Sequence, residues 1–450
     1  MKINIPPGAA DIIKKLDARG FDAYVVGGCV RDCLMGRRAE DWDITTNARP
    51  DEIKAVFAGR KMIDIGERHG TVAVNALGKY YEVTTYRIDG TYGDGRRPDA
   101  VSFTDSLRED LCRRDFTINA MAYNDKTGLV DYFGSHDDVK SCVVRCVGDA
   151  SVRFSEDYLR IMRAYRFAAT LGFNLAHDVR QAAINGRENL RSIAVERVRT
   201  EFMKMLLSDD FDHIEMFFTD CADILFPEIA ALAGFEQNNS YHCHDVLQHS
   251  FHALRATPPD AALRLAALYH DTGKLHTRTT DAADIHHFYG HEAVSAKIAA
   301  AALEHWRFDN HTIDRVLTII KHHGNNYGTE GGRAVKRTAI KRLLNKLGPD
   351  AARDVLNFQV ADNMAKSDKA KAEKLQAVLA AKTLLEDIIA AGEPVKISDL
   401  AISGRDVMKE LGIGPSAAVG EHLQYLMEQV IADPAANTYE NLVDLLRKHS

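Results

Sequence analysis

The chain has 450 residues, of which 46% are hydrophobic and 27% charged, a balance typical of soluble globular proteins. Its net charge of −7 argues against a protein that coats nucleic acid non-specifically, although a local basic patch could still bind one RNA. No apolar run approaches the roughly 20 residues that span a bilayer, and the N-terminus lacks the apolar core of a signal peptide. The seven scattered cysteines fit free thiols, so we expect a cytoplasmic protein with no membrane partner.

Residues 1–147 are predicted to form a mixed α/β region. A helix is expected around 8–19, and it leads into an apolar strand over 23–26. The stretch 89–97 is rich in glycine and charge, which predicts a flexible loop. Further strand-like runs cover 71–74, 80–86 and 143–147.

From about Ser155 onward the pattern becomes helical and stays so. The segment 157–173 is amphipathic, and Gly172 is placed to end its helix. A second such helix is expected over 195–207, and the histidine-rich stretch 240–365 is predicted to be helical with Gly- and Asp-bearing loops. The remaining features are an Ala/Lys-rich helix over 366–391, a break at Pro394, and a small helical unit with turns at Gly404, Gly412 and Pro434.

One short segment near the N-terminus carries a strong chemical signal. Gly27 and Gly28 form a turn after the first strand, and Asp41 and Asp43 follow on a predicted strand. Successive strand residues point to opposite faces, so the two carboxylates share one face and repel each other unless cations lie between them. Paired divalent cations are usual where phosphate is the substrate, and a Gly-Gly turn lets backbone N–H groups approach a phosphate. The segment favours metal-assisted nucleotide transfer; the alternative is a hairpin with an exposed acidic strand.

Six motifs follow one another over about 175 residues: GGCVRD (27–32), DWD (41–43), YEVTTYR (81–87), DLCRRDFTINAMAY (110–123), FSEDYLRIMRAYRFAATLGF (154–173) and ERVRTEF (196–202). This ordered set resembles the class II tRNA nucleotidyltransferases, which are CCA-adding enzymes, and the related bacterial poly(A) polymerases. The resemblance implies an α+β protein with a mixed α/β nucleotidyltransferase head of the DNA polymerase beta-like superfamily, an all-α neck, an HD-type body and a tail. It also implies template-independent, Mg²⁺-dependent addition of CMP and AMP from CTP and ATP to the 3′ end of tRNA, with release of pyrophosphate.

The resemblance assigns roles to residues of the head. Asp41 and Asp43 match the catalytic magnesium ligands, and Glu82 stands where polymerases of this superfamily have a third carboxylate. The residues that match contacts to the phosphates or to the incoming nucleotide, or lie beside such contacts, are Gly27, Gly28, Arg31, Arg113, Arg114 and Asn119.

Base selection is expected at Asp157, Arg160, Arg163 and Arg166, which match the family's nucleotide-recognition helix. Cytosine and adenine present an amino donor beside a ring-nitrogen acceptor, whereas uracil and guanine present the reverse. A carboxylate accepts from the amino group and an arginine donates to the ring nitrogen, so one Asp/Arg pair can select C and A without a template. Asp157 and Arg160 are three residues apart, which makes them neighbours on a helix. The alternative is that Ser155 caps the helix and Asp157 only complements its dipole.

Thirteen of the 19 histidines lie between His242 and His323. The segments HDVLQHS, ALYHDTGK and QVADN in and after this stretch resemble an HD-type phosphohydrolase domain, although a vestigial fold without metal is the alternative. The ligands that the resemblance implies for a divalent transition metal such as Mn, Ni, Fe or Co are His249, His270, Asp271 and Asp362. The residues that could hold a second ion, as phosphoester hydrolysis favours, are His291, His322 and His323.

Four domains are expected: the head (1–147), a helical neck for nucleotide recognition and RNA binding (148–238), an HD-type metal-binding domain (239–365) and a helical tRNA-binding tail (366–450). The segment 397–423 resembles the tails of CCA-adding members, which favours CCA addition over an A-adding enzyme or a poly(A) polymerase. A function of another class stays open, in which HD-type hydrolysis is the main activity and the head only binds nucleotide.

Overall fold

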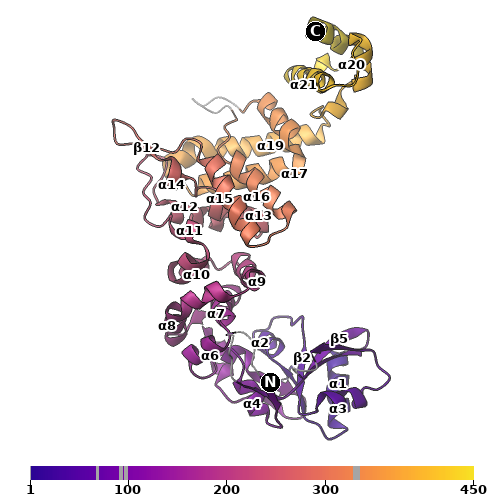
Figure 1. Ribbon diagram of the computed structural model, residues 1–450, viewed down its shortest axis with the longest axis vertical. Coiled ribbons are helices and arrows are strands. Elements are labelled where there is room, and N and C mark those ends of the chain that lie inside the picture. The colour runs from indigo at the N-terminus through magenta and orange to yellow at the C-terminus, as the bar shows by residue number, and fades with distance from the viewer. Residues whose placement is uncertain (1, 67–69, 91–94, 96–99, 328–334, 450) are drawn as a thin grey trace. The chain divides into compact units, whose positions relative to one another are not determined.

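The computed structural model describes residues 2–66, 70–90, 95, 100–327 and 335–449 (Figure 1). The chain divides into two compact units, Met1–Leu225 and Phe226–Ser450, and each is described by itself. None of the helices in the described part of the chain combines the length and apolar character that crossing a membrane requires.

A seven-stranded sheet organises the first unit, with strand order β3-β4-β5-β2-β1-β8-β9. Neighbouring strands are antiparallel except β2 and β5, which run parallel. The strands are β1 (Ala23–Val26), β2 (Asp43–Thr46), β3 (Met62–Gly66), β4 (Thr71–Ala76), β5 (Lys79–Thr85), β8 (Met121–Asn124) and β9 (Gly128–Asp131). The predicted strands over 23–26, 71–74 and 80–86 are therefore confirmed.

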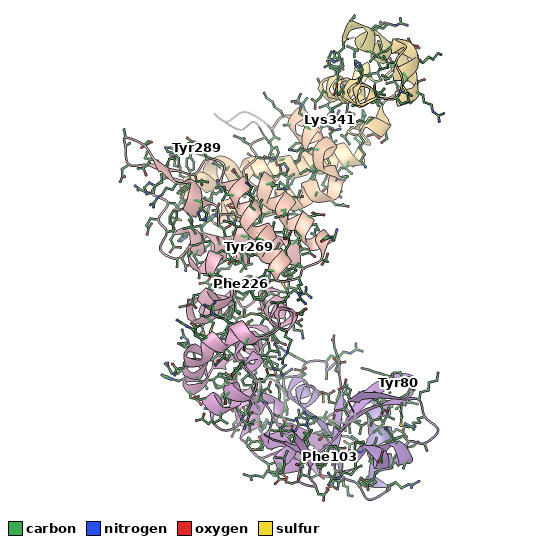
Figure 2. All side chains as sticks on the ribbon, in the orientation of Figure 1. Tyr80, Phe103, Phe226, Tyr269, Tyr289 and Lys341 are labelled. Carbon is green, nitrogen blue, oxygen red and sulfur yellow. The ribbon has the colours of Figure 1, made fainter. Side chains whose placement is uncertain are left out.

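The two faces of this sheet differ where β5 lies. Tyr81 and Val83 are buried, and α1 packs on their face so closely that a β-carbon on Gly8 would lie 2.7 Å from the Tyr81 ring. Tyr80 and Glu82 alternate with them, so they point to the opposite face, where both are exposed. Tyr80 is labelled in Figure 2. This open face is the one on which the predicted carboxylates lie.

Short helices and two small sheets complete the head. β6 (Arg87–Asp89) pairs with β7 (Val101–Phe103), and β10 (Val143–Val144) pairs with β11 (Asn174–Leu175). The helices are α1 (Pro7–Asp17), α2 (Gly28–Leu34), α3 (Pro50–Val56), α4 (Leu107–Cys112), the 3-10 helix η2 (Thr117–Asn119) and α5 (Ser135–Lys140). The strand expected over 143–147 is thus reduced to β10, and most of the loop predicted over 89–97 lies outside the described residues.

Helices make up the rest of the first unit: α6 (Ala150–Glu156), α7 (Leu159–Leu171), α8 (His177–Gly186), η3 (Arg187–Ser192), α9 (Val195–Leu206) and α10 (Phe211–Leu225). The prediction that Asp157 and Arg160 share one helix is wrong. The Asp157 backbone is extended (φ −140°, ψ 106°), and its carboxylate accepts a hydrogen bond from the Leu159 N–H, so Asp157 precedes α7 rather than belonging to it. Gly172 ends α7 in the left-handed conformation (φ +71°), as expected.

The second unit is helical, as predicted. Its elements are α11 (Pro227–Ala230), α12 (Val246–Ala256), α13 (Ala261–Tyr269), α14 (Lys274–Thr277), β12 (Thr279–Thr280), β13 (His286–His287), α15 (His291–His305), α16 (Asn310–His322), α17 (Arg337–Met364), α18 (Asp368–Ala370), the π-helix η4 (Lys371–Leu375), α19 (Gln376–Ala390), η5 (Ile397–Asp399), α20 (Gly404–Leu411), α21 (Ala417–Ala432), η6 (Pro434–Ala436) and α22 (Tyr439–His449).

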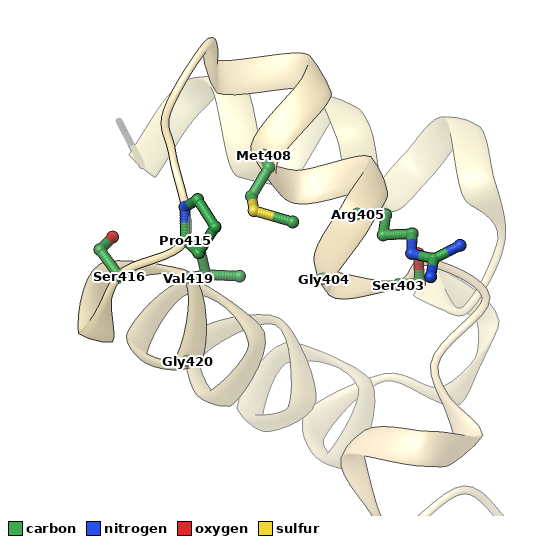
Figure 3. A pocket seen from close by; sticks show the side chains of 8 residues that line it. All are labelled: Ser403, Gly404, Arg405, Met408, Pro415, Ser416, Val419 and Gly420. Atoms are coloured by element: carbon green, nitrogen blue, oxygen red, sulfur yellow. The ribbon is translucent and has the colours of Figure 1, made fainter.

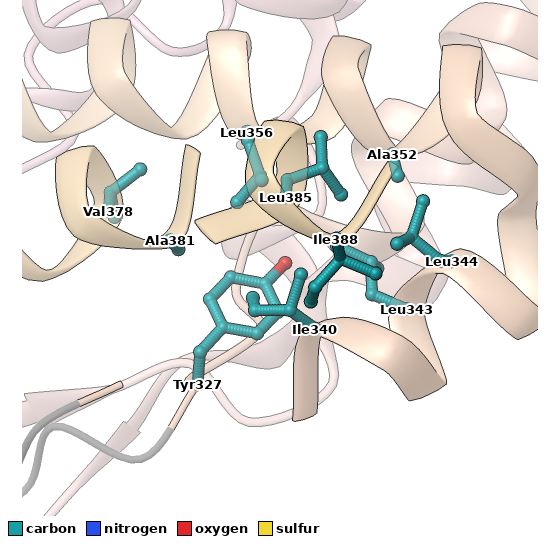
Figure 4. Packing of buried hydrophobic residues seen from close by; sticks show 10 residues of the cluster. All are labelled: Tyr327, Ile340, Leu343, Leu344, Ala352, Leu356, Val378, Ala381, Leu385 and Ile388. Carbon is teal, nitrogen blue, oxygen red and sulfur yellow. The ribbon is translucent and has the colours of Figure 1, made fainter. Parts of the chain in front are cut away.

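Two apolar clusters hold much of this unit together. One joins α17 to α19 through buried residues such as Ile340, Leu344, Leu356 and Leu385 (Figure 4). The other lies in the tail, where α20, α21 and α22 pack around a separate core. The tail therefore has its own hydrophobic support, which burial of apolar side chains provides.

Candidate active site and metal centre

Three carboxylates gather at the open face of the sheet. Strand pairing sets Asp43 opposite Val26, and the parallel pairing of Ile44 with Val83 sets Asp43 beside Glu82 on the same face. Burial raises the pKa of Glu82, and the charges of Asp43 and Asp41 raise it further. Loss of hydration at the carboxylate also raises the pKa of Asp43, although the residue as a whole is exposed; the Arg114 charge opposes this shift and the Asp41 charge adds to it. This mutual repulsion would be relieved by a divalent cation, so the oxygens present fit Mg²⁺.

The sequence predicted that Asp41 and Asp43 lie on one strand. Asp41 lies outside it, because β2 begins only at Asp43. Trp42, between the two aspartates, is buried, while both aspartates are exposed. The alternation of exposed and buried residues that was expected of a strand is therefore kept over Asp41, Trp42 and Asp43.

The Gly-Gly turn passes close to an arginine. Gly27 has a left-handed backbone (φ +81°), and a β-carbon there would lie 3.1 Å from Arg114 Nη1. Glycine adopts this conformation without strain, whereas another residue would be strained and crowded. The turn, which follows β1 directly and starts α2 at Gly28, thus brings backbone groups and the Arg114 guanidinium together beside Asp43.

The two arginines of the RRD motif differ in what they bind. Arg113 Nη2 lies 2.8 Å from Oδ1 of the fully buried Asp110, whose Oδ2 accepts a hydrogen bond from Thr45. Arg114 Nη2 is 3.9 Å from Asp110, and its buried Nε has no hydrogen-bond partner among the described residues. Arg114 is therefore the better placed of the two to bind a ligand, and Asp110 positions them.

Arg31 and Asn119 belong to a network that reaches α7. Arg31 Nη1 donates to Asn119 Oδ1 (2.6 Å), and Asn119 Nδ2 donates to Asp115 Oδ1 (3.3 Å). Arg163 Nη2 lies 2.6 Å from Asp115 Oδ2. Burial alone would raise the pKa of Asp115, but the Arg163 guanidinium holds it at about 2. Asp115 stands in the RRD motif, yet sequence reasoning gave it no role; it links the head to the recognition helix.

The structure pairs Asp157 with an arginine that was not predicted. Asp157 Oδ2 lies 2.9 Å from Arg197 Nη2 on α9, whereas the Arg160 guanidinium is bound to Glu156 and to the carbonyls of Arg153 and Arg113. The ERVRTEF motif contains Arg197, so its position was available from the sequence but its partner was not. Ser155 caps no helix, because its hydroxyl donates back to the Val152 carbonyl.

Arg166 is separated from this pair. Its Nε lies 2.7 Å from Glu201 Oε2, and its guanidinium stacks 3.4 Å from the centre of the Phe167 ring. Glu201 is also 4.0 Å from Arg163 Nη1. Arg166 is therefore held by Glu201 of α9 and by Phe167, its neighbour in the chain.

In the second unit, the four predicted HD residues lie together and are buried. His249 Nε2 is 3.0 Å from Asp362 Oδ1 and 3.3 Å from His270 Nε2, and His270 Nε2 is 3.2 Å from Asp271 Oδ2. His249 comes from α12, His270 and Asp271 follow α13, and Asp362 comes from the last turns of α17. His249, His270 and Asp271 form a group whose geometry could hold a metal ion.

A second group shares Asp271 with the first. His291 Nε2 lies 3.3 Å from Asp271 Oδ1 and 3.2 Å from His323 Nε2, so these three residues could hold another ion. His322 is not part of the group, and its Nδ1 contacts the Asn325 amide instead. Of the two adjacent histidines that were predicted, the structure brings only His323 to the cluster.

All four cluster histidines are oriented in the same way. Each Nδ1 contacts a backbone carbonyl; the acceptors are Ala365 for His249, Ala267 for His270, Phe288 for His291 and Ile320 for His323. If Nδ1 carries the proton, each Nε2 presents a lone pair, and two such lone pairs at 3.2–3.3 Å repel each other. Neither Asp271 oxygen accepts a hydrogen bond of normal geometry from a described residue, although Lys274 Nζ forms an ion pair with Oδ2 at 2.7 Å. This donor set fits cations between the nitrogens and Asp271.

The charge state of His249 and His323 suits that reading, whereas the pKa of His291 is raised: burial lowers it, but the hydrogen bond to Asp271 and the charge of Asp271 outweigh burial. Burial lowers the pKa of His249, and it lowers the pKa of His323 to about 3, so both imidazoles are neutral near pH 7. The pKa of Asp271 lies well below its usual range: burial opposes this, but His270 and Lys274 outweigh it. A cavity of about 560 Å³ opens above the cluster and is lined in part by Lys274, Lys366 and Lys374.

The tail has a shallow cavity of about 700 Å³ between the first turns of α20 and α21 (Figure 3). Arg405 is its charged side chain, and Met408 and Val419 supply apolar walls. Ser403 caps α20 by accepting from the Asp406 N–H, and Asp406 in turn accepts from Ser403. The capping box, rather than a ligand, thus satisfies this helix start.

Three family models match the chain. The "Poly A polymerase head domain" matches residues 23–145, the "Probable RNA and SrmB- binding site of polymerase A" matches 172–232, and the "tRNA nucleotidyltransferase domain 2 putative" matches 288–446. The first contains the carboxylates and the RRD motif, and the last contains His291 and His323 of the second metal-binding group but not Asp271.

Curated relatives and solved structures agree with these models. The chain is 51% identical over 199 residues to the CCA-adding enzyme of Leuconostoc mesenteroides and 49% identical over 198 residues to that of Geobacillus stearothermophilus. Each match covers 44% of this chain and about half the length of the relative (49% and 48%).

The fold match extends over nearly the whole chain. The crystal structure of the Bacillus stearothermophilus CCA-adding enzyme in complex with CTP superposes with a TM-score of 0.72 and 28% identity, covering 99% of this chain and 98% of that one. The Thermotoga maritima CCA-adding enzyme complexed with tRNA shares the fold at a TM-score of 0.61 and 19% identity, covering 99% of this chain and 96% of that one. In its head, in the segment 172–232 and in residues 288–446, the chain is therefore similar to the tRNA nucleotidyltransferases and poly(A) polymerases, and its fold matches that of a CCA-adding enzyme.

Proposed function

We propose that this protein adds CMP and AMP from CTP and ATP to the 3′ end of tRNA without a template, completing or repairing CCA. The observation that carries the proposal is the cluster of Asp41, Asp43 and Glu82 beside Arg114. It stands in a chain whose curated relatives are CCA-adding enzymes and whose fold matches one solved with CTP.

The residues present divide the work of a nucleotidyl transfer between them. Asp41 and Asp43, with Glu82 beside them, would hold Mg²⁺, which when bound helps deprotonate the attacking 3′-hydroxyl and neutralises charge on the departing pyrophosphate. Arg114 is placed to bind the triphosphate, and the Gly27 turn lets the backbone come close to it. Asp157 offers an acceptor for the amino group that cytosine and adenine share.

The domain division and the partners follow from the same proposal. The domain boundaries are those expected from the sequence: 1–147, 148–238, 239–365 and 366–450. In this proposal the neck and the tail bind tRNA. The protein acts in the cytoplasm. The segment 397–423, which resembles the tails of CCA-adding members, supports CCA addition over the A-adding or poly(A) alternatives. Most of the loop 89–97, where part of that difference lies, is outside the described residues.

The product distinguishes nucleotide transfer from hydrolysis. Purified protein with tRNA, CTP, ATP and Mg²⁺ should release one pyrophosphate for each nucleotide added, measured by a coupled pyrophosphate assay alongside RNA length. Release of phosphate without chain extension would instead identify hydrolysis as the main activity.

We also propose that the second unit contains a two-metal centre for phosphoester hydrolysis. The carrying observation is the convergence of four histidine Nε2 atoms around the two oxygens of Asp271. Two nearby cations suit attack on a phosphoester, and the expected ions are Mn, Ni, Fe or Co. Lys274 Nζ, 2.7 Å from Asp271 Oδ2, would orient this shared carboxylate.

Replacing His270 by Ala should empty this centre without affecting the head. His270 is fully buried and sits between His249 and Asp271, so its loss removes a ligand that no described neighbour can replace. Metal analysis after purification is expected to give near-zero transition metal for His270→Ala against clear occupancy for wild type. His311→Ala, at the start of α16 on the protein surface, serves as the control. Equal, near-zero occupancy in wild type and variant would favour the vestigial alternative.

Gly273→Ala should weaken the second group of ligands by displacing backbone. A β-carbon on Gly273 would lie 2.3 Å from the His291 carbonyl oxygen and 2.7 Å from the Ser295 nitrogen, so the start of α15 must shift. Because His291 moves with it, we expect metal content to fall by about one ion per chain. Gly420→Ala, where a β-carbon meets no atom within 4 Å, is the matched control. Full occupancy in Gly273→Ala would show that His291 is not a ligand.

A further inference from the structure

A second, smaller cavity lies beside the one above the metal cluster. Its volume is about 340 Å³, within the range of small-molecule pockets. The two cavities share His323, Gly324, Lys366 and Lys374 in their walls. A molecule bound at the cluster can therefore extend into this side pocket.

The side pocket contains a buried acceptor whose orientation is set by the protein. Gln359 is 1% exposed, and its Nε2 donates to the carbonyls of His322 (3.2 Å), His323 (2.9 Å) and Asn325 (3.0 Å). These three acceptors require the nitrogen on their side, so Oε1 must point the other way. Gln359 Oε1 is buried and has no hydrogen-bond partner among the described residues.

Asn363, one turn further along α17, repeats this arrangement. It is 5% exposed, and its Nδ2 donates to the Gln359 carbonyl (2.7 Å), which leaves Oδ1 buried and without a partner in the described part of the chain. The Tyr327 hydroxyl, 7% exposed, is a third polar group in this wall; it makes no hydrogen bond of normal geometry to a described residue, although the Asn325 and Gln359 side chains interact with it. Buried polar atoms are usually hydrogen-bonded, so two fixed acceptors in one cavity indicate a ligand or solvent that supplies donors.

A lysine stands where the two cavities meet. Lys366 is held by Asp362 (2.5 Å), but Lys374 has no carboxylate within 4.0 Å among the described residues and lies over the Tyr241 ring at 4.6 Å. Lys374 belongs to the π-helix η4. π-Helices are rare in proteins overall, and those that occur are often found at functional sites. Its charge is thus available to an anion between the cluster and the side pocket.

We propose that the side pocket is the subsite for the organic part of the phosphate ester that the metal centre binds. The phosphoryl group would lie at the cluster with Lys374 beside it, while the organic part donates hydrogen bonds to Gln359 Oε1 and Asn363 Oδ1. The ligand class is a phosphate ester with N–H or O–H donors, which a nucleobase or a sugar can supply. This inference rests on the proposed two-metal centre.

The test measures binding at the cluster rather than turnover. Protein loaded with Co²⁺, in excess Mg²⁺, is titrated with inorganic phosphate, ribose 5-phosphate and adenosine 3′-monophosphate while the visible absorption of the Co²⁺ is followed. Nucleotide binding in the head does not change this signal. We expect at least one ester to bind roughly tenfold more tightly than phosphate. Loss of one hydrogen bond in Asn363→Leu should reduce that advantage roughly three- to tenfold.

Matched variants distinguish a loss of the subsite from a loss of folding or of the metal centre. Tyr327→Phe removes only the hydroxyl, and Gln424→Leu removes an exposed amide in the tail and serves as control. Phosphate affinity and Co²⁺ content should be equal in all of them. If only ribose 5-phosphate binds more tightly than phosphate, the side pocket is a sugar subsite. If only adenosine 3′-monophosphate binds more tightly than phosphate, it is a base subsite. An ester advantage that Asn363→Leu and Tyr327→Phe both retain in full would overturn the subsite. Failure of wild type to bind Co²⁺ would overturn the metal centre and the subsite with it.

Discussion

Asp43→Ala is expected to reduce nucleotide addition at least a thousandfold. The variant removes the carboxylate that stands between Asp41, Glu82 and Arg114, and with it a ligand of the cation that activates the 3′-hydroxyl. Loss of a catalytic metal removes several kcal/mol of transition-state stabilisation, and about 4 kcal/mol corresponds to a thousandfold in rate. The measurement is kcat/KM for CMP addition to tRNA that lacks CCA. Asp41→Ala should behave in the same way.

The control for this prediction is Asp137→Ala, which removes an exposed carboxylate on α5 of the same unit. Circular dichroism should show the same helix content for all three variants, because Asp41 and Asp43 are exposed and support no buried contact. Addition within tenfold of wild type in Asp43→Ala would contradict the assignment of the catalytic carboxylates.

Asp157→Ala is expected to lose discrimination between bases more than catalysis. Its carboxylate accepts from the amino group that cytosine and adenine share, and without it a carbonyl at that position meets no opposing anion. UTP should then compete with CTP at least tenfold better, since a charged hydrogen bond contributes about 1.5–3 kcal/mol. The measurement is kcat/KM for CTP, ATP and UTP. Unchanged ranking and rates would show that Asp157 acts only at the start of α7.

The Asp157–Arg197 pair adds a second variant to this series. Arg197→Ala should reduce use of both CTP and ATP, because Arg197 Nη2 holds Asp157 Oδ2 at 2.9 Å. In the wild-type protein the Arg160 guanidinium is bound to Glu156. If it moves from Glu156 to donate to the base when a nucleotide binds, Arg160→Ala should also reduce use of both CTP and ATP. Arg191→Ala, which breaks only an exposed ion pair with Glu188, is the control. If Arg160→Ala is silent while Arg197→Ala is not, the base is read by the pair that the structure shows.

The sheet and the carboxylate cluster were within reach of sequence reasoning. Alternation along 80–86 put Glu82 and Tyr80 on one face, and the buried run 23–26 located β1. The parallel pairing of β2 with β5, which sets Asp43 beside Glu82, was not deducible, because it joins segments almost 40 residues apart. Local patterns specify elements, whereas pairing between them depends on the whole fold.

The partners of the arginines also escaped prediction. Helical spacing suggested that Asp157 would contact Arg160. Instead, Asp157 precedes α7, and its carboxylate accepts a hydrogen bond from the Leu159 N–H. In this position the Asp157 carboxylate pairs with Arg197. Spacing rules apply only inside a continuous helix. In the same way, nothing in the sequence favoured either of the adjacent His322 and His323 as a metal ligand. The position of each ring at the end of α16 determines that His323 faces Asp271 while His322 contacts Asn325.

One measurement tests the proposed function most directly. Purified protein is incubated with Mg²⁺ and tRNA that ends at the discriminator base, with CTP, with ATP or with both, and the 3′ ends are sequenced. The account predicts that CTP alone adds two C residues and stops, and that CTP with ATP gives CCA and stops. Addition of A alone to the discriminator base, or an unlimited run of A, would contradict it in favour of another member of the family.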